Sequence, residues 1–294
     1  MKTKKSKRLR QQELYGWMYV LPSFAILFVF DILPIGLAVY FSFTKYNMFS
    51  AAEWIGLENY ANVFKSSTFY SALWNTVKYV VVTVPFQTLF ALLVAAFIAD
   101  KMRSHYGNLM KSVIFIPVII SSIAAAAVWK VMFHTKGGII NVLIGLFGAA
   151  PVNWLGAKNL AFLCVCIVTV WKNVGYYMVI YYAGIMDIST EQQEAAVMDG
   201  ASPAQRFWYV TIPNLRPITY MVVTLGVISS FQIFDIVYQL TGGGPGTSTI
   251  TLAYMVYTYA FSNQKMGYAS AIAVILLLFV LLVQRLQDRV LKQE

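Results

Sequence analysis

Six long apolar stretches alternate with short polar segments along the chain. They are Leu14–Thr44, Tyr79–Ala99, Ser112–Trp129, Asn159–Met186, Pro217–Phe234 and Met266–Gln284. A helix needs roughly 20 mostly apolar residues to cross the hydrocarbon core of a bilayer. Only a helix can do so singly, because it pairs its backbone polar groups within the segment. The pattern therefore predicts an all-α polytopic membrane protein whose six transmembrane helices occupy a domain at residues 14–285.

Composition and charge agree with this prediction and give an orientation. Of the 294 residues, 59% are hydrophobic and 12% are charged, which is too few charges for the surface of a soluble domain. The net charge is +10, and it sits between the spans rather than on one folded face, so we expect no nucleic-acid partner. Fourteen Lys and Arg residues fall on the side of the two termini, against eight on the other side or in the spans. This bias predicts cytoplasmic tails at residues 1–13 and 286–294 of a multi-pass membrane protein.

The loop between the fourth and fifth spans, residues 187–216, carries helix start and stop signals. The N-cap candidates are Ser189, Thr190 and Ser202, each followed three residues later by Gln, which is the capping-box spacing. Gly200 can adopt the left-handed conformation that ends a helix, and Pro213 is expected to end the second helix. The loop is thus predicted to form two short helices, with Phe207 and Trp208 anchoring them to the spans. These features alone are equally compatible with a plain structured loop.

The same loop resembles the EAA loop of permease subunits in binding-protein-dependent ABC importers. The residues that carry the resemblance are Glu194, Ala195, Ala196, Asp199, Gly200, Ala201, Ile212 and Pro213. In that family the loop is a coupling helix that docks into a cleft of the cytoplasmic ATPase subunit. The resemblance implies the same role for these residues here.

Further segments resemble the carbohydrate-uptake branch of this family. They are residues 54–60, 75–76, 231–235, 240–245 and 248–249. The resemblance extends from about Leu14 to Arg289 and implies a MalF-like fold in the bacterial cytoplasmic membrane. It also implies a second homologous permease subunit, two ATPase subunits and an extracytoplasmic solute-binding protein that delivers a sugar or oligosaccharide.

No P-loop sequence is present, and the glycine-rich segment at residues 242–246 lacks the following lysine. We therefore expect no cofactor on this chain, no catalytic residue and no enzymatic activity, with ATP and Mg²⁺ bound by the partner ATPase. Cys164 and Cys166 lie on different faces of one helix, so neither a disulfide nor a metal site is predicted.

Polar and aromatic residues inside the spans are the candidates for a solute pathway, since polar groups in lipid usually face a cavity or a partner. The candidates are Ser121, Ser122, Trp171, Asn173, Gly175, Tyr177, Tyr181, Ser229, Ser230, Gln232 and Asp235. Asn173, Tyr177 and Tyr181 are four residues apart and share one helical face. Helix packing remains an alternative for the tyrosines and serines, as does structural pairing for Asp235.

Three other functions stay open. An ABC permease of this kind could take a non-sugar polyol such as a glycerol phosphate. A secondary transporter driven by an ion gradient would need intramembrane carboxylates, for which Asp31 and Asp235 are the candidates. An intramembrane enzyme would need a catalytic motif, and none is recognised.

Overall fold

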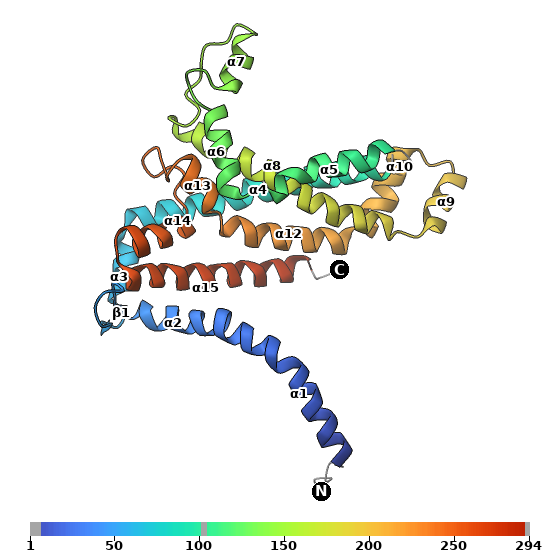
Figure 1. Cartoon of the computed structure of the whole chain (residues 1–294). Coiled ribbons are helices and arrows are strands. Elements are labelled where there is room, and N and C mark those ends of the chain that lie inside the picture. The colour runs from blue at the N-terminus through green and yellow to red at the C-terminus, as the bar shows by residue number, and fades with distance from the viewer. Residues whose placement is uncertain (1–6, 101–104, 292–294) are drawn as a thin grey trace. The chain divides into compact units, whose positions relative to one another are not determined.

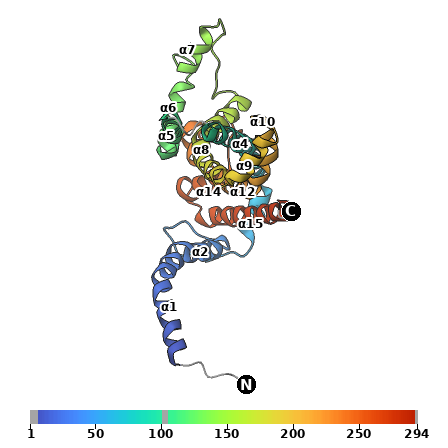
Figure 2. The ribbon, with the colours of Figure 1, turned by 90° about the vertical axis from the view of Figure 1, so that its right-hand side faces the viewer.

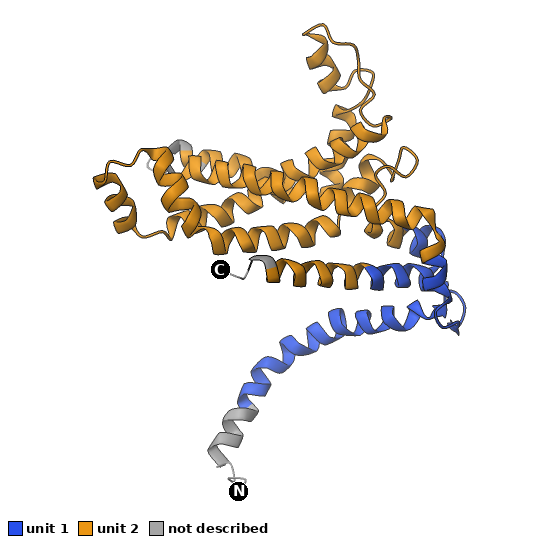
Figure 3. Ribbon diagram, turned by 180° about the vertical axis from the view of Figure 1, so that it is seen from behind, with its two compact units in different colours: residues 1–63, 258–275 blue, residues 64–257, 276–294 orange. Residues whose placement is uncertain are grey.

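The computed structural model describes residues 7–100 and 105–291. Two of the fourteen Lys and Arg residues counted on the side of the termini, Lys101 and Arg103, lie outside the described residues. So do the outermost parts of both tails. The chain divides into two compact units, shown in Figure 3. The first comprises residues 1–63 and 258–275, and the second comprises residues 64–257 and 276–294.

The described residues are largely helical, as Figure 1 shows. The α-helices are α1 (Lys7–Leu27), α2 (Leu33–Ser42), α3 (Glu58–Lys65), α4 (Ser67–Asp100), α5 (His105–Ile119), α6 (Ser122–Met132), α7 (Ile139–Gly145), α8 (Lys158–Met186), α9 (Thr190–Met198), α10 (Pro203–Arg206), α11 (Ile212–Asn214), α12 (Arg216–Phe231), α13 (Asp235–Leu240), α14 (Leu252–Tyr257) and α15 (Met266–Leu291). Three π-helical turns are η1 (Phe28–Ile32), η2 (Phe207–Thr211) and η3 (Thr258–Ser262). Two short antiparallel strands, β1 (Thr44–Lys45) and β2 (Glu53–Trp54), form the only described sheet.

In the first unit, α1, η1 and α2 form one apolar helical run that ends in the small sheet. The side chain of Asn59 on α3 is buried there, and its Nδ2 donates to the carbonyl oxygens of Ser42 (2.9 Å) and Thr44 (2.8 Å). Ser42 is the last residue of α2, where a helix leaves carbonyl acceptors unpaired, and Thr44 is the first residue of β1. Asn59 therefore fixes the turn between α2 and the sheet.

In the second unit, α4 packs along α8, while α12 packs on α4 and α5 packs on α8 (Figure 2). Small and aromatic side chains bury this contact: Ala91, Ala95, Tyr177, Tyr181 and Val222 are all at most 2% exposed. Small residues let membrane helices approach closely without a solvent-driven force between them. The part of α15 in this unit packs through Phe279 against Phe231 of α12, with ring centroids 5.4 Å apart.

Four described helical runs are long and apolar enough to cross a membrane: Tyr15–Ser42, Ser67–Ala99, Lys158–Met186 and Met266–Arg289. They coincide with four of the six predicted spans. The third predicted span is instead two helices, Leu109–Ile119 and Ser122–Met132, which meet at a bend of 98°. The fifth is the shorter helix Arg216–Phe231, interrupted before α13. The described chain is therefore a helical membrane protein with four spanning helices, or five if the bent pair is one span.

Candidate functional site

A polar pocket of about 280 Å³ opens between α5, α8 and α12. Its lining residues are Val118, Asn173, Tyr176, Tyr177, Leu225, Ile228, Ser229 and Gln232. The α8 residues recur at helical spacing, as do those of α12, so each helix contributes one face. Four predicted pathway residues come together here, namely Asn173, Tyr177, Ser229 and Gln232. Amides, a hydroxyl and phenol rings in one cavity can hydrogen-bond a polyhydroxylated molecule while an aromatic ring packs on its C–H face.

Gln87 of α4 does not line the pocket but is hydrogen-bonded to its lining residue Asn173, and the sequence reasoning did not select it. It is fully buried, and its Oε1 accepts from Asn173 Nδ2 at 3.4 Å. Its Nε2 makes no hydrogen bond with the described residues. A Cβ at Gly226 would lie 2.5 Å from that nitrogen, so α12 has a glycine where the glutamine needs room. The available signal was a glutamine within an otherwise apolar stretch.

Several predicted pathway residues lie elsewhere. Tyr181 is fully buried in the core between α8 and α4 and does not line the pocket. Ser230 is turned toward α4, where its hydroxyl lies 2.9 Å from that of Thr83. Gly175 provides close packing, since a Cβ there would overlap the Ile114 carbonyl oxygen of α5. Their contact with solute stays a prediction.

The remaining candidates sit at a second cavity and at helix ends. Trp171 contacts Trp129 edge-on and lines a wholly different, apolar cavity of about 670 Å³ between α4, α5 and α8. Ser121 and Ser122 form the bend between α5 and α6. Asp235 is the first residue of α13. None of these four pathway candidates lines the polar pocket.

Lys172 is a charged residue within the fourth predicted span, and it forms a hydrogen bond at the bend between α5 and α6. Its Nζ donates to the carbonyl oxygen of Val118 at 3.4 Å. Because α5 ends at Ile119, that carbonyl is among the last four of the helix, which have no intrahelical donor. A cation at a helix C-terminus is also favoured by the helix dipole.

The loop at residues 187–216 forms the predicted helical hairpin beyond the far ends of α8 and α12. Ser189 accepts from the Gln192 N–H, and Ser202 makes a reciprocal capping box with Gln205. Gly200 has φ +79°, as a left-handed terminator requires. Its N–H bonds to the Val197 carbonyl, and the next N–H reaches back to Ala196. This pair of bonds is the Schellman motif, so local sequence alone defines the turn.

Two details of the hairpin prediction are wrong. Pro213 does not end the second helix, because the helical run continues through η2 and α11 to Asn214. The π turn interrupts the regular hydrogen-bond register just before Pro213, which lets the missing proline N–H be tolerated. Phe207 does line a cavity against α4 and α8, but Trp208 is 63% exposed and is not anchored to the spans.

The hairpin tip presents a mixed surface. Glu194 and Ala195 are exposed, Val197 is 52% exposed and Met198 is 86% exposed. Asp199 also lies exposed beside them. A short helix with small and apolar side chains between carboxylates can fit closely into a groove on another protein.

Residues 55–293 match the family model described as the inner membrane component of binding-protein-dependent transport systems. The chain belongs to this family. The predicted resemblance is confirmed, and the protein is thereby a transport component of a cytoplasmic membrane.

Two permeases of this family and one solved structure match this chain over most of its length. The trehalose/maltose transport permease MalF of Thermococcus litoralis is 30% identical, over 94% of this chain and 93% of that protein. The lactose transport permease LacF of Rhizobium radiobacter is 32% identical, over 97% and 96%. A chain of a bacterial ABC transporter that imports the acidic polysaccharide alginate has the same fold, with a TM-score of 0.83, 22% identity and coverage of 96% and 99%.

Proposed function

We propose that this chain is one of two homologous permease subunits that enclose the translocation pathway of an ABC importer for a sugar or oligosaccharide. The observation that carries the proposal is the continuity between hairpin and pocket. Helix α8 ends at Met186, just before the hairpin, and α12 begins at Arg216, just after it. The same two helices supply most of the lining of the polar pocket. A displacement of the hairpin therefore acts directly on the pocket walls.

The hairpin is the coupling element in this proposal. Its exposed segment from Glu194 to Ala201 docks on a separate ATPase subunit, which binds ATP and Mg²⁺. Two such ATPases close on nucleotide and move the hairpins of the two permease subunits, and Ile212 and Pro213 transmit the motion toward α12. The coupling is a free energy shared between the nucleotide and solute sites.

The proposed topology has six spans, with the bent pair α5–α6 as the third and α12–α13 as the fifth. Both termini and the hairpin then face the cytoplasm, in keeping with the Lys and Arg distribution. An extracytoplasmic binding protein delivers the solute to the opposite face.

The solute class is supported by the pocket and by the relatives. The pocket residues Asn173, Ser229 and Gln232 offer hydrogen-bonding groups, and Tyr176 and Tyr177 offer rings. Two relatives are permeases for trehalose/maltose and for lactose. A polyol such as a glycerol phosphate is the alternative solute that a transport assay has to include.

The test compares two glycines with nearly equal left-handed backbones. Gly200 (φ +79°) and Gly148 (φ +81°) both have open space where a Cβ would lie. A side chain in this conformation costs roughly 1–2 kcal/mol, so Gly200→Ala and Gly148→Ala impose a similar local strain. In vesicles with the ATPases and the binding protein, we expect Gly200→Ala and Glu194→Lys to reduce uptake and solute-stimulated ATP hydrolysis together. Gly148→Ala should leave both unchanged, and undiminished uptake in both hairpin variants would refute the coupling role.

A further inference from the structure

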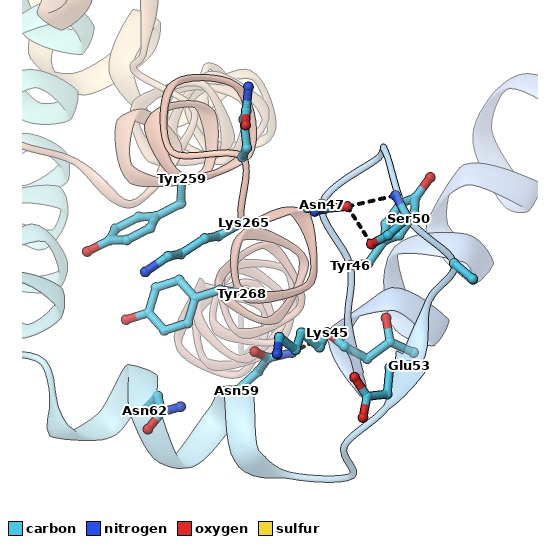
Figure 4. A pocket seen from close by; sticks show the side chains of 13 residues that line it. Lys45, Tyr46, Asn47, Ser50, Glu53, Asn59, Asn62, Tyr259, Lys265 and Tyr268 are labelled. Atoms are coloured by element: carbon cyan, nitrogen blue, oxygen red, sulfur yellow. Dashed lines mark hydrogen bonds between the residues drawn. The ribbon is translucent and has the colours of Figure 1, made fainter.

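The first unit contains a cavity of its own. It has a volume of about 610 Å³ and is lined by Thr44, Lys45, Tyr46, Asn47, Ser50, Ala51, Glu53, Asn59, Asn62, Tyr259, Gln264, Lys265 and Tyr268 (Figure 4). We call it the tyrosine–lysine pocket. Its volume is in the range of small-molecule sites, about 300–1,000 Å³.

The backbone of this pocket is fixed by contacts within the unit. The Gly267 N–H donates to the Tyr46 carbonyl at 3.1 Å, and a Cβ at Gly267 would overlap the Thr44 carbonyl oxygen. Asn47 Oδ1 accepts from the N–H groups of Phe49 and Ser50 and from the Ser50 hydroxyl. The bond from Gly267 to Tyr46 holds the loop after α2 against the start of α15, and the bonds to Asn47 fix the turn within that loop, so the chain's own contacts define the pocket.

The lining is rich in hydrogen-bond donors and carries a net positive charge. Lys45 lies opposite Glu53 in the two-stranded ladder, so those two charges offset each other. Lys265 adds a second ammonium, and Glu53 is the sole carboxylate among the lining residues. Lys265 lies with Tyr259 and Tyr268, and the polar ends of all three point to the same side (Figure 4). The rings of the two tyrosines are 4.6 Å apart between centroids.

The pocket also lies near the ends of two apolar helical runs, which corresponds to the level of the lipid headgroups. It is built from the residues just after the apolar run Tyr15–Ser42 and those at the start of the apolar run Met266–Arg289. The end of a spanning helix is where the polar headgroup region begins. Tyrosine and lysine side chains are favoured at that level.

We propose that the tyrosine–lysine pocket binds the phosphoglycerol headgroup of an anionic membrane lipid. The phosphodiester carries one negative charge, which matches the one unbalanced lysine, and the two phenol hydroxyls can donate to its oxygens. The glycerol hydroxyls can bond to Glu53 and Asn62. A soluble glycerol phosphate shares this chemistry, but the position at two helix ends favours the lipid. The binding chemistry does not depend on the transport function proposed above. Only the choice of leaflet rests on the proposed topology, which puts this pocket on the side opposite the two termini, at the outer leaflet.

The experiment measures lipid retained by the full-length protein. The chain is extracted from nanodiscs of phosphatidylcholine with one-fifth phosphatidylglycerol, and bound lipid is counted by native mass spectrometry. We expect wild type to retain phosphatidylglycerol preferentially and Lys45→Gln/Lys265→Gln to lose roughly tenfold in that preference, since each lysine near anionic lipid contributes measurably to binding. Lys65→Gln removes an exposed lysine of α3 that does not line the pocket and should change nothing. Thermal unfolding of each variant verifies that it is folded.

A second arm distinguishes the two sources of the headgroup. Delipidated protein is titrated with glycerol 3-phosphate up to millimolar concentration, and its unfolding temperature is followed. The proposal expects no shift there and a lysine-dependent shift with phosphatidylglycerol micelles. It is overturned if the double lysine variant keeps its preference for phosphatidylglycerol, or if soluble glycerol phosphate alone produces the lysine-dependent shift.

Discussion

The side-chain Nδ2 of Asn173 donates to the side-chain Oε1 of Gln87 at 3.4 Å and joins α8 to α4 beside the polar pocket. Asn173 is therefore both a pocket wall and the hydrogen-bonding partner of a fully buried glutamine. Losing one member of such a pair leaves the other desolvated, which costs about 1–3 kcal/mol.

This pair gives a prediction for stability. Asn173→Leu should lower the free energy of unfolding by about 1–3 kcal/mol, because Gln87 Oε1 loses its donor. Replacing both, Asn173→Leu with Gln87→Met, should recover most of the loss, because no buried polar atom of the pair remains. Thermal unfolding in detergent measures both. A double variant less stable than the sum of the two single effects would contradict the pairing.

Gly226 should be intolerant of even one added methyl group. Gly226→Ala puts a Cβ 2.5 Å from Gln87 Nε2, and overpacking of this kind costs typically 1–3 kcal/mol. Gly36→Ala is the matched control, since Gly36 is also helical but has nothing within 4 Å of its Cβ position. Unfolding temperatures should fall for the first and hold or rise for the second, because alanine is the better helix former. Equal effects in both would mean that the glutamine can move aside.

Lys172 should hold the bend between α5 and α6. Lys172→Met removes its bond to the Val118 carbonyl, and hydrogen bonds to charged groups are worth about 1.5–3 kcal/mol. We expect spin labels at Val128 on α6 and Ile167 on α8 to report a broader distance distribution in the variant. Lys172→Arg keeps a cation and should stay near wild type. If Lys172→Met leaves the distribution unchanged, other contacts must hold the bend.

Ser202 should set the order of the second hairpin helix. Ser202→Ala removes the N-cap acceptor for the Gln205 N–H, a loss of about 1 kcal/mol, whereas Ser202→Gly should cost only a few tenths. Hydrogen exchange of the backbone amides at residues 204–206 should therefore accelerate several-fold in the alanine variant and much less in the glycine variant. The reverse order of exchange rates would show that the cap does not limit opening.

The hairpin could be predicted from the sequence because its determinants are local. Ser189, Gly200 and Ser202 each act on backbone groups within a few residues, so reading them in order is enough. Pro213 was misjudged for a related reason: the π turn before it changes the backbone register, and no local pattern announces that turn.

The polar pocket could be predicted only in part because its geometry is set by packing between distant segments. The spacing of Asn173 and Tyr177 puts them on one face, but it does not say that Tyr181 on the same face ends in the core. Ser229 and Ser230 are neighbours in sequence, yet one lines the pocket and the other bonds to α4. Which of the two serines faces the pocket depends on how α12 is rotated about its own axis. Gln87 was missed because its role depends on its hydrogen bond with Asn173 of α8 and on the space left by Gly226 of α12.

The break at Ser121 also has a consequence for hydration. As the N-cap residue of α6, Ser121 makes no side-chain bond to the first turn, so the leading N–H groups of that helix have no partner among the described residues. Hydrocarbon cannot satisfy such groups, and each one left bare there costs several kcal/mol. In the proposed topology, in which α5 and α6 together form the third span, the membrane around this protein therefore cannot be dry at Ser121. Either a neighbouring polypeptide shields the bend, or water molecules must reach it from one surface of the bilayer.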